Sequence, residues 1–281
     1  MKIKIITDST ADLAPEIVSS LDITVIPIYI HFGLETYRDG IDLTADEFYK
    51  KLTESGIYPK TAQPSPDDFF KEYSDAIKKY DGIVSIHISS KISGTLDSAR
   101  IAAGRVAKQI PLQLIDSKLN SAGLALVTTA AAQIAKTGAD FDTVISETLR
   151  AIDETRMFGM FETTKYLIHG GRANQAIVSA AKMLKIMPML TFHDGRIMPT
   201  GFVRTINSGV NKICSYVRRK KPIGELSIVH SMSEERAIQL KHRLAEFLPD
   251  KQIGISQLGA ALGSHGGPGV LLVALRQKKT N

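Results

Sequence analysis

The chain has 281 residues, of which 43% are hydrophobic and 23% charged, a balance typical of ordinary soluble globular proteins. This length favours two domains over a single core. The single cysteine, Cys214, excludes an internal disulfide framework and a cysteine-based zinc cluster, and fits a reducing cytoplasm. The N-terminus resembles a first strand rather than a signal peptide, and the longest weakly polar run, residues 122–135, is about two-thirds of a membrane span. We therefore expect a cytoplasmic protein that does not span a membrane.

Charge is distributed unevenly along the chain. Residues 1–155 hold 16 lysines and arginines against 22 acidic residues, whereas residues 156–281 hold 19 against 7. A basic second half suggests an acidic partner or a phosphate. Aromatic content is 6% without tryptophan, and no stacking motif is present, so we expect no nucleic-acid partner. The basic run at 218–221 is most simply the solvated end of a helix before Pro222.

In the first half, short alternating stretches predict strands, and apolar residues at helical spacing predict helices between them. Strands are expected at 3–7, 23–30, 83–88 and 112–116, with an edge extension at 32–43 that turns at Asp39-Gly40. Helices are expected from Pro15, at 46–52, from Pro66, from Thr95, at 117–135 and at 141–153. Prolines exclude helix and central strand from the loop at 59–66, where Ser65 should cap the next helix.

In the second half, strands and helices again alternate. Strands are expected at 157–163, 189–192, 196–203, 226–230, 254–258 and 270–275, and helices at 165–169, 176–185, 206–220 and 234–247. Asp194-Gly195 is a strong hairpin signal between two of these strands. We expect a glycine-rich loop at 263–269 and a frayed tail at 276–281. The alternation predicts an α/β fold whose N-terminal sheet is mainly parallel, with helices packed on its faces.

The stretch 82–106 predicts a strand, a polar loop and a helix. The loop brings the hydroxyls of Ser89, Ser90, Ser93 and Thr95 to a helix N-terminus, where free N–H groups and the helix dipole suit a carboxylate or phosphate. Neither the P-loop nor the dinucleotide-binding fingerprint is present. The alternative is that Ser93 or Thr95 is only a helix cap.

Two other polar loops, 8–10 and 116–117, also follow predicted strands. Because ligands sit beyond the carboxyl ends of parallel strands, these loops and the loop at 89–95 should converge on one edge of the sheet. This convergence favours a binding role for Ser93 over capping alone.

The loops together resemble the DegV family of bacterial fatty-acid-binding proteins. The matching motifs are DSTADL at 8–13, PKTAQPSP at 59–66, SSKISGT at 89–95, DS at 116–117, HGGR at 169–172 and GSHGGPG at 263–269. They occur in the family's order and cover nearly the whole chain. One departure is Ala62, where the family often has serine, so that position offers no hydroxyl.

The resemblance implies two α/β domains, which we place at residues 1–155 and 156–281, the second with a mixed sheet. One long-chain fatty acid would lie with its acyl tail buried between them. The family's carboxylate-binding hydroxyls fall on Thr61 and Ser93, with Gly94 and Thr95 beside Ser93. The family's histidine falls on His265, which could donate to the carboxylate or pair with phosphate when protonated. The alternative for His265 is a structural histidine held by loop backbone.

Members of this family serve as the acyl-carrying subunit of a separate fatty acid kinase. By resemblance, the kinase would supply ATP and phosphorylate the bound carboxylate, and the acyl phosphate would enter phospholipid synthesis. The protein would be a carrier without cofactor or catalytic residues of its own, with the kinase as partner and transient contact with a membrane or acyltransferase. Arg172, and less firmly Arg204, would meet the acyl phosphate or the kinase. The alternative for Arg172 is a charge beyond a helix C-cap.

Other interpretations remain open. A serine hydrolase would use Ser93 as nucleophile and His265 as base, but no G-x-S-x-G motif and no evident orienting acid is present. A regulatory module for another small carboxylate would use the same polar loops. The seven histidines show no H-x-x-x-H or H-E-x-x-H spacing, which disfavours a metal enzyme. The methionines at 157, 160, 183, 187 and 189 could line an acyl tunnel or simply belong to the core.

Overall fold

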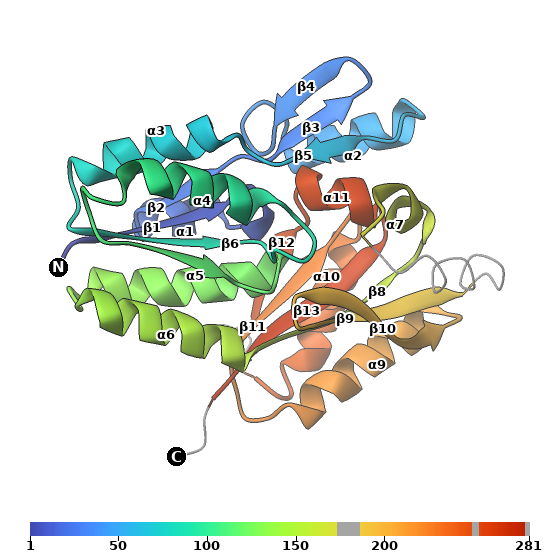
Figure 1. Ribbon diagram of the computed structural model, residues 1–281. Helices are drawn as coiled ribbons and strands as arrows, with labels where there is room; N and C mark the ends of the chain where they lie inside the picture. The colour runs from blue at the N-terminus through green and yellow to red at the C-terminus, as the bar shows by residue number, and fades with distance from the viewer. Residues whose placement is uncertain (173–185, 249–252, 279–281) are drawn as a thin grey trace.

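The computed structural model describes residues 1–172, 186–248 and 253–278, and the N-terminal half contains a four-stranded parallel sheet. Its strands are, in spatial order, β2 (Ile23–Ile26), β1 (Ile3–Asp8), β6 (Gly82–His87) and β7 (Leu112–Asp116). Every residue of β1 and β6 is buried, as expected for inner strands covered on both faces. One face is covered by α3 (Pro66–Ile77) and α4 (Thr95–Val106), the other by α5 (Ser121–Lys136) and α6 (Phe141–Glu154) (Figure 1). The predicted parallel sheet is confirmed.

Helix starts in this half follow the capping signals in the sequence. The Ser65 hydroxyl accepts a hydrogen bond from the Asp68 N–H (3.2 Å), and the Asp68 carboxylate accepts one from the Ser65 N–H (2.8 Å). This reciprocal pair satisfies two N–H groups at the start of α3, and Pro66 has no N–H to satisfy. The predicted cap is confirmed. The shorter elements here are η1 (Ser9–Ala11), α1 (Pro15–Ser20) and α2 (Ala45–Glu54).

Residues 29–38 and 60–62 form a small antiparallel sheet, which differs from the strand expected at 23–30. Its order is β4 (Glu35–Arg38), β3 (Tyr29–Phe32) and β5 (Lys60–Ala62). The single strand expected at 23–30 is wrong, because Pro27 has no N–H and the chain leaves the parallel sheet there; β3 then pairs elsewhere. The turn expected at Asp39-Gly40 is confirmed, with Gly40 at φ +72° and the Ile41 N–H bonded to the Arg38 carbonyl (3.1 Å), and a further turn at Gly33 (φ +61°) joins β3 to β4. Asp39 is buried.

The second half contains a six-stranded mixed sheet, as expected. Its order is β10 (Arg196–Val203), β9 (Met187–His193), β8 (Thr155–Phe161), β13 (Val270–Gln277), β11 (Ile223–His230) and β12 (Ile253–Gln257). The pairing of β11 with β12 is parallel, and the other pairings are antiparallel. The predicted hairpin at Asp194-Gly195 is confirmed, with positive φ at both residues. Helices α9 (Ile206–Arg219) and α10 (Glu234–Leu244) pack on one face.

Three other expectations need correction. The glycine-rich stretch expected as a loop at 263–269 is largely helix: α11 (Ala260–Gly266) ends at Gly267 (φ +69°). The helix expected from residue 117 begins at Ser121, because Lys118 has a left-handed backbone (φ +55°). Arg276, expected in a frayed tail, belongs to β13 and forms an ion pair with Glu154 (3.0 Å). The helix expected at 176–185 lies outside the described residues.

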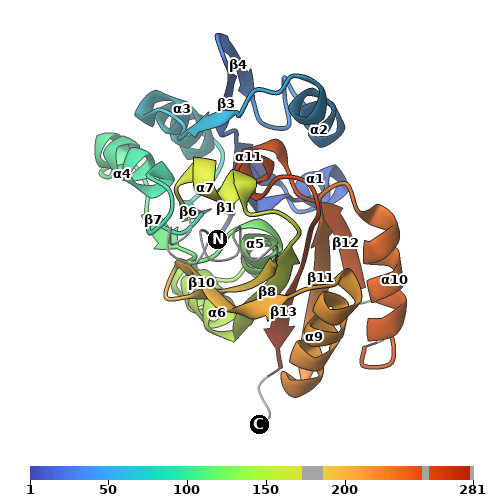
Figure 2. The same cartoon turned by 90° about the vertical axis from the view of Figure 1, so that its right-hand side faces the viewer.

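Helix α5 lies between the two large sheets (Figures 1 and 2). One hydrophobic cluster joins α5 and α6 to residues of β1 and β6 on one side and of β8, β11 and β13 on the other. The short helix α7 (Lys165–Gly170) packs beside α11. The division into domains between residues 155 and 156 stays a prediction. Helix α6 ends at Glu154, and β8 begins at Thr155.

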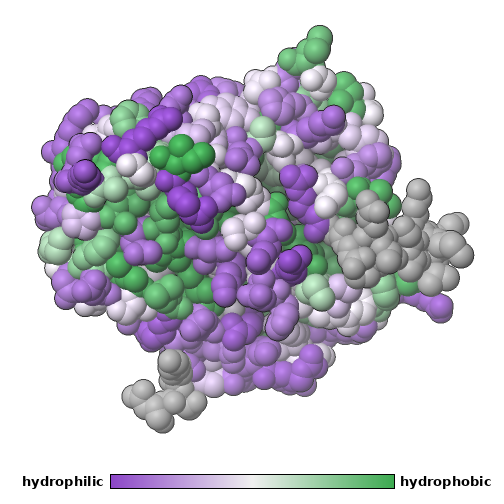
Figure 3. All heavy atoms as spheres, in the orientation of Figure 1, coloured by the Kyte–Doolittle hydropathy of each residue, from purple (hydrophilic) through white to green (hydrophobic). Residues whose placement is uncertain are grey.

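The surface in Figure 3 is mainly hydrophilic over the C-terminal half, and a hydrophobic area lies over the N-terminal sheet and α5. The hydrophilic half is also the basic half of the sequence. None of the helices in the described ranges has the length and apolar character needed to cross a membrane.

Candidate ligand-binding site

The carboxyl end of the parallel sheet is held together by Asp8, the last residue of β1. Its carboxylate accepts hydrogen bonds from the N–H groups of Thr10 (3.1 Å) and Ile88 (3.0 Å), and it contacts His87 Nδ1 at 3.0 Å. In the neighbouring loops, the Ser90 N–H and hydroxyl donate to Asp116. The predicted convergence of the three polar loops is therefore confirmed.

The Asp8–His87 contact continues to Ser85, whose hydroxyl lies 2.6 Å from His87 Nε2, and then to Tyr73. This order of groups resembles the triad of a serine hydrolase. However, Asp8, His87 and Ser85 are all 0% exposed, so no substrate can reach them. The chain of hydrogen bonds is a buried support for the loops, and sequence analysis missed it because its members are far apart in sequence.

Ser93 lies in the loop between β6 and α4, as predicted. Its hydroxyl forms a hydrogen bond with that of Thr95 (2.8 Å) and accepts one from the Thr95 N–H (3.3 Å). Ser93 and Gly94 line a cavity, whereas Thr95 is fully buried behind Ser93. Gly94 allows the 59–66 loop to approach, because a Cβ there would lie 2.0 Å from Gln63 Oε1. Ser93 thus both supports the helix start and faces the cavity.

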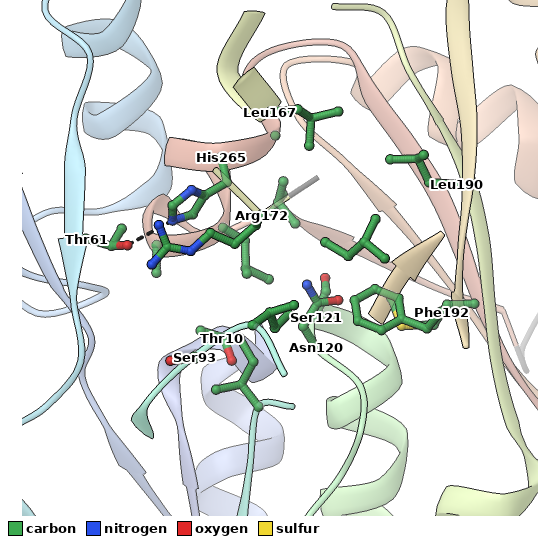
Figure 4. Close-up of a pocket in the computed structure, with 18 of the residues that line it drawn as sticks. Thr10, Thr61, Ser93, Asn120, Ser121, Leu167, Arg172, Leu190, Phe192 and His265 are labelled. Atoms are coloured by element: carbon green, nitrogen blue, oxygen red, sulfur yellow. Dashed lines mark hydrogen bonds between the residues drawn. The ribbon is translucent and has the colours of Figure 1, made fainter. Parts of the chain in front are cut away.

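Thr61 on β5 and His265 on α11 meet at the polar end of this cavity, although 204 residues separate them. Thr61 Oγ1 lies 2.8 Å from His265 Nε2 (Figure 4). Burial, with a further contribution from the Arg172 charge, lowers the pKa of His265 to about 4, so the imidazole is neutral at neutral pH. This argues against the expectation that a protonated His265 pairs with phosphate.

The other ring nitrogen of His265, Nδ1, is buried and has no hydrogen-bond partner in the described part of the chain. Gly170 packs against it, since a Cβ at Gly170 would lie 2.2 Å from Nδ1. A neutral imidazole carries one N–H. When Nε2 carries it, His265 donates to Thr61, and the Thr61 hydroxyl proton is free to donate to a ligand.

The cavity has a volume of about 290 Å³ and lies between the two halves of the fold. Figure 4 shows Thr61, Arg172 and His265 together at one end, Ser93 and Thr10 near them, and Leu190 and Phe192 at the other end. The polar lining residues are Thr10, Thr61, Gln63, Ser93, Asn120, Ser121, Arg172, Thr191 and His265. Most other lining residues are apolar and include Ile88, Ile92, Met157, Phe158, Phe161, Leu167, Leu190, Phe192, Ile197, Leu258, Leu262 and Leu272.

Several lining residues were not identified as site residues from the sequence. Gln63, Asn120 and Ser121 reach the cavity only through the packing of their loops, and the cue for Thr10 was its place after a strand. Of the methionines, Met157 lines the cavity. Met160, Met187 and Met189 belong to the core of the second sheet, and residue 183 lies outside the described ranges.

The two predicted arginines have different positions. Arg172 lines the cavity at its polar end, and its Nη1 donates to the Gly170 carbonyl (2.6 Å). Arg204 is exposed at the end of β10 and is not part of the cavity lining. The structure therefore brings Arg172, but not Arg204, to the other candidate residues.

A basic and aromatic rim lies beside the polar end, formed by α7, by Arg172 just after it and by Tyr58 in the segment before β5. The Tyr58 ring stacks on His169 (centroids 3.8 Å apart), and Lys165 Nζ lies 5.1 Å from the centroid of the Tyr58 ring. Lys165, His169 and Arg172 are exposed, and no carboxylate pairs with them within the described ranges. This rim suits an anionic partner.

The hydrolase interpretation loses support from this geometry. Ser93 bonds Thr95 and His265 bonds Thr61, so the expected nucleophile and base are not hydrogen-bonded to each other. Together the fold and the cavity define an α/β protein in which two sheets enclose a ligand site, polar at one end and apolar along the rest.

Sequence comparisons place the chain in a family. A family model described as "Uncharacterised protein, DegV family" matches residues 2–278. A DegV domain-containing protein of Caldanaerobacter subterraneus is 31% identical over 280 residues, which is 99% of each chain. Protein DegV of Bacillus subtilis is 30% identical over 275 residues, covering 96% of this chain and 98% of the relative. The chain belongs to the DegV family.

Solved structures agree with this assignment. A structure titled as fatty acid binding of a DegV family protein from Thermus thermophilus has a TM-score of 0.90 at 29% identity, covering 98% of this chain and 99% of that chain. DegV of Bacillus subtilis, described as a fatty acid binding protein, has a TM-score of 0.88 at 29% identity, covering 99% of this chain and 100% of that chain.

Proposed function

We propose that the protein binds one long-chain fatty acid in the cavity, with the carboxylate at the end formed by Thr61, Ser93 and His265. The observation that carries this proposal is the uneven lining of the cavity, which is polar at one end and largely apolar elsewhere. The two structural relatives described above are named as fatty-acid-binding proteins.

The apolar part of the cavity suits the acyl tail energetically. A C16–C18 tail has about fifteen methylenes at roughly 0.8 kcal/mol each, so full burial contributes on the order of 10 kcal/mol. Removing the carboxylate from water costs several kcal/mol unless donors meet its oxygens. Thr61 and Ser93 supply hydroxyl donors without a fixed charge, so the tail provides affinity and the polar end sets the orientation. Gly94 provides close backbone approach beside Ser93, and Thr95 supports Ser93 from behind.

We further propose that the bound carboxylate is presented to a separate fatty acid kinase. A carboxylate oxygen would form a bond to the γ-phosphorus of ATP, the bond to the bridging oxygen would break, and ADP would leave with that oxygen. The carrier would contribute no catalytic group. Arg172 and the basic rim would meet the added phosphate or the kinase, because the cationic side chains of Arg172 and Lys165 have no carboxylate partner in the described chain. The acyl phosphate would then serve phospholipid synthesis.

Mass spectrometry of the organic extract from protein purified without added lipid tests the binding proposal. One C14–C18 fatty acid per chain is the expected result. A variant with a charge in the apolar wall, Leu190→Asp, is the matched control and should carry little lipid. A polar small carboxylate in the extract of the unmodified protein would favour the regulatory module and contradict the acyl site.

A further inference from the structure

Two acidic residues of the N-terminal half, Asp12 and Asp39, hold the start of helix α11. Asp12 accepts hydrogen bonds from the Gly259 N–H (2.9 Å) and the Ser121 hydroxyl (2.6 Å). Asp39 accepts them from the Ala260 N–H (3.2 Å) and the Ser9 hydroxyl (2.7 Å). These N–H groups belong to the cap and first residue of α11, which have no partner within the helix.

The contact between the Asp12 carboxylate and the Gly259 backbone is close, and it accompanies an unusual backbone conformation at Asp12 and Ser121. A Cβ at Gly259 would lie 2.6 Å from Asp12 Oδ1, so the carboxylate occupies the space that a side chain would need. Asp12 (φ +49°) and Ser121 (φ +44°) both adopt the left-handed backbone conformation, which is uncommon for residues other than glycine. Such strain persists only where surrounding contacts over-determine it, here the bond between the two side chains.

Burying the carboxyl groups of Asp12 and Asp39 lowers the stability of the folded protein when they are ionised. Burial raises the pKa of Asp39 to about 6 and raises the pKa of Asp12 well above its usual range. The other ionisable groups that face the pair are Asp8 on β1 and Tyr49 on α2, and neither supplies positive charge. No lysine, arginine or histidine forms an ion pair with Asp12 or Asp39 in the described chain. A carboxylate is nevertheless suited to the place, because it only accepts hydrogen bonds.

The far end of α11 carries His265, the partner of Thr61. Ala261, Leu262 and Gly266 on the same helix line the cavity. With seven residues, α11 is about 10 Å long, so its start and His265 lie within two turns of each other. Its middle fits closely against α2, since a Cβ at Gly263 would lie 2.7 Å from Tyr49 Oη. Figure 1 shows α11 beside α7 and next to β5, which carries Thr61.

We propose that Asp12 and Asp39 are positioning residues for the polar end of the cavity, holding α11 so that His265 reaches Thr61. Asp12 also fixes Ser121, a second residue of the cavity wall. This inference rests on the proposed function, because it names residues outside the ligand contact that set recognition of the carboxylate. Its measurable consequence is head-group selectivity, defined as the ratio of the Kd values for hexadecanol and palmitic acid.

A double-mutant cycle tests this role. We expect Asp39→Ala and His265→Ala each to lower head-group selectivity about tenfold, the value of one hydrogen bond to a charged group. Because Asp39 acts through His265, the double variant should be no less selective than His265→Ala alone. Gly259→Ala, which disturbs the contact without removing a carboxylate, should lower selectivity in the same direction and covers the case in which Asp39→Ala does not fold.

Ile213→Ala is the matched control, since Ile213 belongs to the core of the second sheet and does not line the cavity, so its truncation should leave selectivity unchanged. The positioning role is contradicted if Asp39→Ala and Gly259→Ala weaken binding of acid and alcohol equally, or if the Asp39 effect persists undiminished in the His265→Ala background. Failure of the proposed function looks different: the unmodified protein would then bind neither ligand.

Discussion

Replacing Asp39 with asparagine should remove a pH-dependent loss of stability. The Asp39 side chain is buried, and its pKa is raised from 3.8 to about 6 in the folded protein. Between these values the unfolded chain releases its proton while the folded chain keeps it, so the free energy of unfolding falls as pH rises from about 4 to about 6. A shift of about two units corresponds to about 3 kcal/mol. Asp12 contributes in the same direction, because burial raises its pKa as well.

The comparison with the variant isolates this effect. His265 has a lowered pKa of about 4, so its contribution has the opposite sign: stability rises as pH rises from about 4 to 6.5. That contribution is common to both proteins and cancels in their difference. We therefore expect the free energy of unfolding of Asp39→Asn minus that of the unmodified protein to increase by about 2–3 kcal/mol between pH 4 and pH 7.

Urea denaturation at several pH values, followed by circular dichroism, measures this difference. Asp42→Asn is the control on the same loop. The hydrogen bonds from Arg38 lower the pKa of Asp42 to about 2, so its titration lies below the tested range and its difference from the unmodified protein should not vary with pH. A difference for Asp39→Asn that is equally flat would refute the assignment of Asp39 as a buried, costly carboxylate.

The remaining predictions concern the ligand. Ser93→Ala should weaken fatty acid binding about tenfold while the protein still folds; unchanged binding and unchanged acyl-phosphate formation would remove Ser93 from the site. Arg172→Ala should impair turnover with the kinase more than fatty acid affinity in a titration, and the reverse order would make Arg172 a ligand contact. Gly170→Ala should lower affinity about tenfold by displacing His265. Gly104→Ala, where a Cβ meets open space, is its control, and equal affinities would show that His265 tolerates the methyl group.

Local signals in the sequence predicted the strand, loop and helix of residues 82–106 and the cap at Ser65. Periodicity and turn chemistry act within a few residues, so these elements follow from their own sequence. The break at Pro27 is also local, but the pairing of β3 with β4 and β5 is not. Helix α11 was missed because glycine is a poor helix former and close packing against α2 compensates here.

The polar end of the cavity was only partly predictable. Ser93 followed from the position of its loop, whereas Thr61 and His265 came from the family resemblance, since no local pattern joins residues 204 positions apart. The contact of Asp12 with Gly259 joins residues even further apart, by 247 positions, and nothing in either segment marks it. Residues that act through tertiary contacts cannot be predicted from the periodicity and spacing of the sequence, because these signals are local.

Helix α5 also limits how the cavity can open. Leu124 and Val127 on this helix are fully buried in the cluster that joins both sheets. Separating the two sheets would expose this cluster to water, at a cost of roughly 1.5–3 kcal/mol for each large apolar side chain. The total is comparable to the whole stability of a typical protein, about 5–15 kcal/mol. Helix α5 therefore keeps the two sheets together, and under the proposed function a fatty acid would enter through a local opening of the cavity wall.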